Sequence, residues 1–159
     1  MNTCIYCKIA SGATAAREVY RDDELLVFLD PSPVNPGHCV ILPLRHHASM
    51  FSLEASLRHR LFDLAFRLGR ALAKHPDSDC FNLHHAHGEH AGQAIRHAAV
   101  HLIPRVGTDG FAFGWRMLSR PANEGEMAEW LSQKLQNPVD DGDEAEEIET
   151  ADDEDDEDV

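Results

Sequence analysis

The 159-residue chain lacks an apolar run long enough to cross a membrane, since a spanning helix needs about 18 to 20 consecutive apolar residues. Its first residues, Met-Asn-Thr-Cys-Ile-Tyr-Cys, also lack the basic and apolar segments of a secretory signal peptide. We therefore expect a cytoplasmic protein without a membrane partner. The chain has only four cysteines. In a cytoplasmic protein, cysteines more often bind metal or pack as buried thiols than form disulfides.

A surplus of basic residues is also missing. Residues 137–159 contain eight Asp, six Glu and no Lys or Arg, so they carry the whole formal net charge of −14. The rest of the chain has 14 acidic residues against 14 Lys and Arg. This balance gives no electrostatic reason to expect a nucleic acid partner. The acidic segment repels itself and can bury little apolar surface, so we expect a disordered tail.

Cys4 and Cys7 form a C-x-x-C pair near the start of the sequence. Such a pair is compatible with a zinc site, with a redox dithiol, or with two small apolar side chains that only fill space. A redox pair normally follows a strand and begins a helix, and the few preceding residues cannot supply that strand. Zinc would need two further ligands from elsewhere in the chain.

Periodic patterns predict several strands and one long helix. Leucines spaced three and four residues apart predict an amphipathic helix over residues 53–74. A second, shorter amphipathic helix is predicted over residues 124–136. Strands are predicted at residues 18–20, 25–30, 39–43 and 80–84.

The most informative stretch is residues 94–103, which are rich in apolar and β-branched residues and precede Pro104. This composition predicts a strand. Because side chains alternate between the faces of a strand, His97, Ala99 and His101 would share one face. Two histidines there could bind a phosphate or a metal, or transfer protons. They could equally be two solvated histidines on an edge strand.

These residues resemble a known signature. Gly92-Gln93, His97, His101 and the closing Leu102-Ile103-Pro104-Arg105 are similar to the signature strand of the histidine triad (HIT) superfamily of nucleotide hydrolases and transferases. The resemblance extends to Phe28-x-Asp30-x-Ser32-Pro33, to Pro36-Gly37-His38, and to Leu42-Pro43 followed by His46.

The resemblance implies an α+β fold, with an antiparallel sheet of about five strands and one long helix. It also implies a homodimer that extends the sheet. We expect a HIT-like nucleotide-binding domain at residues 1–118, a C-terminal helical extension at residues 119–136 and the acidic tail at residues 137–159.

In the family, the central histidine of the triad attacks the phosphorus, and that position here holds Ala99. The catalytic positions that keep a functional side chain are Gln93 and His101, and Ala86 and Ala94 stand where the family has further polar groups.

Asp30 matches the carboxylate that binds the ribose hydroxyls. The resemblance assigns nucleotide binding to Tyr6, Ile9, Phe28, Asp30, His38, Gly92, Gln93 and His101. The three apolar members of this set could equally be ordinary core residues.

The resemblance also implies a structural zinc ion bound by Cys4, Cys7, His46 and His97, as in bacterial members of the family. Two thiolates and two imidazoles make a closed tetrahedral set. Residues 84–90 contain four more histidines. They could form a second metal site or the polar rim of an active site.

The resulting expectation is a purine nucleotide-binding protein with lost or strongly reduced hydrolase or transferase activity, because Ala99 has no nucleophilic atom. Two alternatives are kept. One is an active hydrolase of nucleoside phosphoramidates or dinucleoside polyphosphates, which attacks with water or with a relocated histidine such as His87. The other is an interaction module, in which residues 124–136 and the acidic tail bind a protein partner.

Overall fold

The computed structural model describes residues 4–75, 78, 80–110 and 123–136. The chain divides into two units, Met1–Arg116 and Met117–Val159. The predicted acidic tail, residues 137–159, lies outside the described residues.

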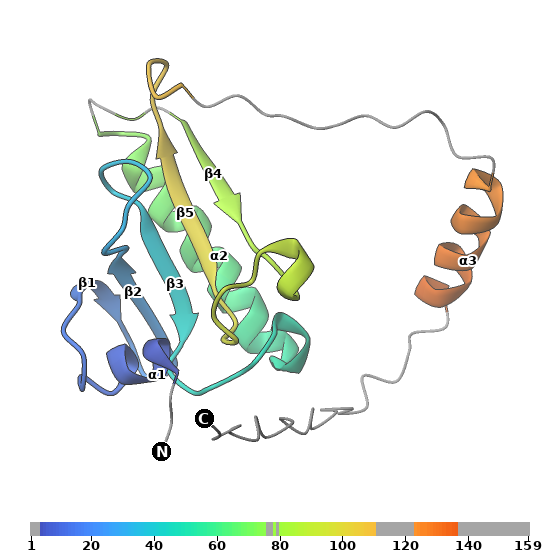
Figure 1. Ribbon diagram of the computed structural model, residues 1–159, viewed down its shortest axis with the longest axis horizontal. Coiled ribbons are helices and arrows are strands. Elements are labelled where there is room, and N and C mark those ends of the chain that lie inside the picture. Colours follow the sequence, from blue (N-terminus) through green and yellow to red (C-terminus); the bar gives the residue numbers. More distant parts are fainter. Residues whose placement is uncertain (1–3, 76–77, 79, 111–122, 137–159) are drawn as a thin grey trace, which may run out of the picture. The chain divides into compact units, whose positions relative to one another are not determined.

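The first unit is built on a five-stranded antiparallel sheet (Figure 1). With one long helix beside the sheet, this arrangement confirms the predicted α+β fold. In spatial order the strands are β1 (Arg17–Arg21), β2 (Leu25–Leu29), β3 (Cys39–Pro43), β5 (Val100–Arg105) and β4 (Cys80–His84).

Helix α2 (Ala55–Leu72) runs across one face of the sheet and lies within the range predicted for it (Figure 1). Its buried side chains Leu61, Leu64 and Ala65 join the core that this face forms. A Cβ atom added at Gly69 would lie 2.5 Å from the Phe81 ring. Glycine at this position therefore allows α2 to approach β4 closely.

The other face of the sheet has its own apolar cluster. Helix α1 (Ile5–Ala10) contributes Tyr6 and Ile9, which pack with Phe28 of β2 and with Ala99. Strands β2 and β3 are therefore buried on both faces. Their continuous apolar sequences fit this position, because only one-sided burial produces alternation.

The predicted strand over residues 94–103 is wrong in its first half. Strand β5 begins only at Val100. The Ala98 N–H donates to the carbonyl of His47 at 2.6 Å, and the His97 N–H donates to the carbonyl of Ile95 at 2.8 Å. The backbone before Val100 therefore bonds to itself and to the loop after β3, and it joins no strand ladder.

The second unit contains helix α3 (Glu124–Gln136), as the sequence predicts. Its apolar residues Met127, Trp130, Leu131 and Leu135 are exposed. Among the described residues, no helix combines the length and the apolar character needed to cross a membrane.

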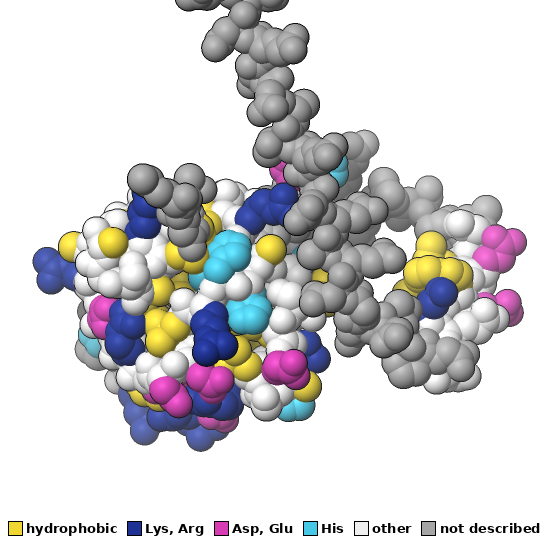
Figure 2. Space-filling model, turned by 90° about the horizontal axis from the view of Figure 1, so that it is seen from below, with side chains coloured by type: hydrophobic (Ala, Val, Ile, Leu, Met, Phe, Trp, Pro, Cys, Tyr) yellow, Lys and Arg dark blue, Asp and Glu magenta, His cyan; other side chains and the backbone are white. Residues whose placement is uncertain are grey.

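Charged side chains of both signs are interspersed on the face of the first unit that Figure 2 shows. This mixture fits the balanced charge of the chain outside its acidic segment.

Candidate functional site

Four side chains of metal-binding type meet beside the start of α1. Cys7 Sγ lies 3.2 Å from His46 Nδ1, and His97 Nδ1 lies 3.6 Å from the sulfurs of both Cys4 and Cys7. All four ligand atoms lie within 4.8 Å of one another. Around a tetrahedral zinc ion, nitrogen and sulfur ligands bound at 2.0–2.3 Å are roughly 3.4–3.8 Å apart. These residues therefore fit a zinc ion.

A hydrogen bond to the backbone orients the His97 ring for such a role. Its Nε2 donates to the carbonyl of Pro43 at 2.9 Å, so its Nδ1 faces the two thiols. A backbone partner on the second ring nitrogen is typical of metal-binding histidines. Burial lowers the pKa of His97, which favours the neutral ring that binds metal. The side chain is 2% exposed.

A second group lies at the other end of the same sheet face. Asp30 directly follows β2, His38 directly precedes β3, and His101 lies in β5. His38 Nε2 is 3.0 Å from His101 Nδ1. Asp30 Oδ2 is 3.7 Å from the first nitrogen and 3.6 Å from the second.

The hydrogen bonds of His38 determine where the protons of this group lie. The Val34 N–H donates to His38 Nδ1 at 3.2 Å, so a neutral His38 carries its proton on Nε2. That proton is donated to His101 Nδ1. His101 in turn carries its own proton on Nε2. We interpret the group as a hydrogen-bond chain, because a metal ion would need the lone pair that His38 Nε2 lacks here.

Both histidines of this hydrogen-bond chain have a lowered pKa, which favours their neutral forms. Burial lowers the pKa of His38, and the negative charge of Asp30 only partly opposes this effect. Burial also lowers the pKa of His101, with the neighbouring His38 acting in the same direction. Asp30 Oδ1 accepts the Ser32 N–H at 2.8 Å, and its carboxylate has further acceptor sites for a ligand.

The three predicted base-binding residues lie in one buried apolar cluster. The rings of Tyr6 and Phe28 meet edge to face, with centroids 5.9 Å apart. Ile9 and Ala99 belong to the same buried cluster. Burial and the charge of Asp30 raise the pKa of Tyr6 to about 12, so its hydroxyl stays protonated. This packing agrees with the core alternative, and Tyr6 additionally borders the Ala99 position.

Gly92 and Gln93 shape the loop before β5. Gly92 ends a short 3-10 helix, Glu89–Ala91, with a left-handed φ of 87° that suits glycine. Gln93 Oε1 accepts the Gly88 N–H at 2.9 Å. Its Nε2 donates to the carbonyls of Ala48 at 2.9 Å and Ile95 at 3.2 Å. The Gln93 amide thus connects the loop to the segment that follows β3.

The histidines of residues 84–90 point to different neighbours. The His84 and His101 ring centroids are 6.4 Å apart, whereas the His87 ring packs on Phe51 at 4.5 Å. The Nδ1 of His85 lies 3.0 Å from the carbonyl oxygen of Ala99. Within the described part of the chain, these loop histidines form no common metal-binding group.

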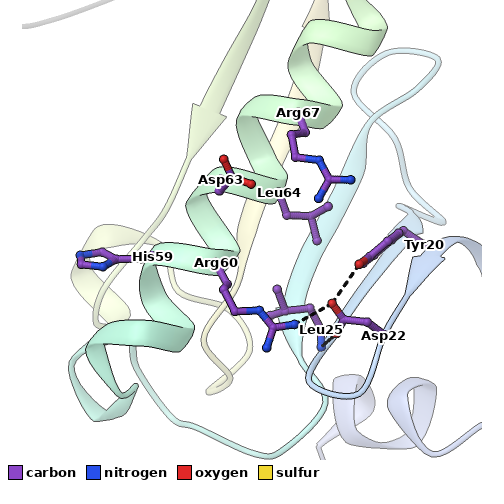
Figure 3. A pocket seen from close by; sticks show the side chains of 8 residues that line it. All are labelled: Tyr20, Asp22, Leu25, His59, Arg60, Asp63, Leu64 and Arg67. Carbon is purple, nitrogen blue, oxygen red and sulfur yellow. Dashed lines mark hydrogen bonds and ion pairs between the residues drawn. The ribbon is translucent and has the colours of Figure 1, made fainter.

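Sequence reasoning missed a cluster on the face that α2 covers (Figure 3). Tyr20 and Arg60 both donate to Asp22 Oδ2 at 2.9 Å, and Arg60 also pairs with Glu24. These bonds fasten the turn between β1 and β2 to α2, beside a cavity of about 320 Å³. The signal in the sequence was the run Asp22-Asp23-Glu24 with an arginine on the long helix.

A second cavity of about 570 Å³ lies beside the Cys2His2 group. Its lining includes Cys4 and His46 together with Ala94 and Arg96.

A model of the HIT domain matches residues 12–108. The chain is 34% identical over 114 residues to "Protein hit" of Bacillus subtilis, covering 71% of this chain and 79% of that one. It is 34% identical over 108 residues to an adenylylsulfatase of Arabidopsis thaliana, covering 68% of this chain and 55% of that one.

Solved structures give the same fold. A HIT family protein from Bacillus anthracis superposes with a TM-score of 0.75 at 33% identity, covering 87% of this chain and 98% of that one. A zinc-bound histidine triad family protein from Mycobacterium smegmatis superposes with a TM-score of 0.66 at 25% identity, covering 85% and 94%.

Proposed function

Because the chain belongs to the HIT domain family, whose model matches residues 12–108, we propose that it binds a purine nucleotide and transfers the nucleotidyl group only slowly. The observation that carries this proposal is the position of Ala99. It lies between the metal-type ligand His97 and the hydrogen-bond chain of His101, on the face that also bears Tyr6. The family signature has its attacking histidine at this position.

Nucleotide binding is supported by the groups that surround Ala99. The Asp30 carboxylate can accept both ribose hydroxyls, because one carboxylate offers several acceptor sites. His101 presents an Nε2–H donor suited to a phosphate oxygen. We keep Tyr6, Ile9 and Phe28, which form one buried apolar cluster, as the residues beside which the base would lie.

The same surroundings explain why transfer would be slow. Alanine at position 99 has no lone pair to attack phosphorus, and loss of a covalent nucleophile commonly costs several powers of ten in rate. Ala86 and Ala94 have no side-chain donors, and the loss of one such donor costs roughly 2.7–4 kcal/mol of transition-state stabilisation. The Gln93 amide is already bonded to three backbone groups.

We propose that the chain binds one structural zinc ion through Cys4, Cys7, His46 and His97, as the bacterial zinc-containing branch does. The 3.2–3.6 Å separations of three sulfur–nitrogen pairs, with all four ligand atoms within 4.8 Å of one another, support this assignment. The relative from Mycobacterium smegmatis is described as zinc-bound. The ion would connect Cys4 and Cys7 near the N-terminus to His97, which lies two residues before Ala99.

Three further assignments are proposals of the same kind. A homodimer would extend the sheet at β4, which is an edge strand. The chain would divide into a nucleotide-binding domain at residues 1–118, a helical extension at 119–136 and the tail at 137–159. It would act in the cytoplasm.

A melting assay with AMP tests nucleotide binding directly. We expect saturating AMP to raise the melting temperature of the full chain by several degrees, since about 100-fold excess over Kd adds about 2.7 kcal/mol. Asp30→Asn should remove most of this shift because it removes the charged diol acceptor. Asp63→Asn, on the exposed side of α2, is the matched control and should keep the shift. If no purine nucleotide stabilises the unmodified chain, the proposal is wrong.

A further inference from the structure

His85 makes an unexpected contact with the residue that stands at the attacking position. Its Nδ1 lies 3.0 Å from the carbonyl oxygen of Ala99. A carbonyl oxygen only accepts hydrogen bonds, so the proton of this bond belongs to His85 Nδ1. A neutral His85 ring held in this way therefore has its lone pair on Nε2.

The strand register explains why this ring can reach Ala99. His84 is the last residue of β4 and lies opposite His101 in β5. His85 follows directly and is not part of the ladder, so its ring can turn toward the backbone of Ala99. The side chain is exposed, and no described residue bonds to its Nε2.

The neighbouring histidines are placed differently. The ring of His87, the relocated nucleophile suggested by the sequence, packs against Phe51 with centroids 4.5 Å apart. The ring of His84 meets His101 edge to face at 6.4 Å. Of the described histidines in residues 84–90, only His85 has a hydrogen bond to the backbone of Ala99.

We propose that His85 supplies the imidazole that position 99 lacks and that it carries the residual nucleotidyl transfer of this protein. This inference rests on the proposed function, because it requires a nucleotide bound beside Asp30 and His101. A backbone carbonyl bonded to one ring nitrogen fixes the tautomer and leaves the lone pair on the other nitrogen, as a nucleophilic or metal-binding histidine requires.

The reaction needs no further reagent when the leaving group is an anion. With adenosine 5′-phosphosulfate, the Nε2 lone pair of His85 forms a bond to phosphorus, and the bond from phosphorus to the sulfate oxygen breaks. The electron pair leaves with sulfate. The resulting imidazolium keeps its proton on Nδ1 and still donates it to the Ala99 carbonyl oxygen. Water then attacks phosphorus, the N–P electron pair returns to Nε2, one water proton enters the solvent, and AMP is released.

The test measures AMP release from adenosine 5′-phosphosulfate by the full-length protein. His85→Asn places an amide N–H near the position of Nδ1, so it can keep the bond to Ala99 while it removes Nε2. We expect this variant to release AMP at least about tenfold more slowly than the unmodified chain. His87→Asn, the same change in the same loop, should stay within roughly twofold.

A second measurement does not depend on any variant. Rapid quenching in base, where phosphorylated histidine survives, should give an adenylylated peptide that contains His85. No AMP release above a protein-free blank, equal release by His85→Asn, or an adduct on another residue would each overturn the inference. The AMP-induced melting shift in the same samples tests the proposed function separately, since binding can persist when transfer does not.

Discussion

His38 Nε2 lies 3.0 Å from His101 Nδ1, and this single hydrogen bond determines which nitrogen of His101 faces a ligand. His38 is itself fixed by the Val34 amide, and it is 5% exposed. The donor that His101 offers to a phosphate thus depends on a residue in the loop before β3, which need not touch the ligand.

This dependence predicts coupled effects on nucleotide affinity. His101→Ala should weaken AMP binding about tenfold, because a hydrogen bond to a charged phosphate contributes about 1.5 kcal/mol. His38→Ala should weaken it less, and the double variant should be no worse than His101→Ala alone. Titration calorimetry of all three, with the exposed His59→Ala as control, measures the coupling. Strictly additive losses would show that His38 acts independently of His101.

The same two histidines predict how stability depends on pH. Both have a pKa lowered from the usual value of 6.5, so above that pH neither the folded nor the unfolded chain binds these protons. As pH falls below 6.5, the unfolded chain takes up protons that the folded chain does not. The free energy of unfolding should then fall by up to about 1.4 kcal/mol per pH unit for each histidine, until the folded pKa is reached.

Urea unfolding between pH 7.5 and 5 checks this dependence. Protonation of the Cys2His2 group would act in the same direction, so the decisive comparison is with His101→Gln, which leaves that group unchanged. Its stability should fall less steeply than that of the unmodified chain. If the free energy of unfolding falls equally steeply with pH in both proteins, His101 does not cause the dependence.

Zinc content has a matched control within the chain. We expect about one zinc ion per chain in protein purified without chelator. Cys4→Ser should lower the bound zinc strongly because one of four ligands is lost. Cys80→Ser, in β4 and outside the ligand group, should leave it unchanged. Elemental analysis decides the matter, and equal zinc in the unmodified chain and Cys4→Ser would rule out the site.

The contact between α2 and β4 predicts an unusual response to a helix-favouring substitution. Alanine normally stabilises a helix interior by up to about 1 kcal/mol relative to glycine. At Gly69 the added Cβ would lie 2.5 Å from the Phe81 ring, so Gly69→Ala should destabilise the protein by about 1–3 kcal/mol. Phe81→Leu in the same chain should relieve part of this loss. A stabilised Gly69→Ala variant in urea unfolding would contradict the packing described here.

Local patterns in the sequence predicted the elements whose burial is regular. The leucine spacing predicted α2 within two residues at each end, and the apolar runs predicted β2 and β3. They failed at residues 94–99, where the Ala98 N–H bonds to His47, a residue distant in sequence. No local pattern contains that information.

The candidate site was predictable only as a set of residues. The resemblance grouped Cys4, Cys7, His46 and His97, and the structure brings their ligand atoms within 4.8 Å. The proton positions of His38 and His101, and the bond from His85 to Ala99, depend on how loops distant in sequence pack together. Such contacts follow from tertiary structure and could not be derived from spacing.

Position 99 offers a gain-of-function test. Ala99→His would place an imidazole between His97 and His101, where the family signature has its attacking histidine. The gain should be partial, because Ala86 and Ala94 still leave the phosphate with few donors. Adding Ala94→Ser should raise the rate further with little change in AMP affinity. Because Ala99 is only 9% exposed, the AMP-induced melting shift must first show that the variant still binds nucleotide.

The rate of AMP release from adenosine 5′-phosphosulfate, compared between the unmodified chain and Ala99→His, tests the central claim most directly. We predict that the unmodified chain turns over more slowly than about 1 per second and that Ala99→His is faster by roughly tenfold or more. Turnover by the unmodified chain at or above that rate would contradict the claim that Ala99 limits transfer. An Ala99→His variant that binds AMP but gains no activity would contradict it as well.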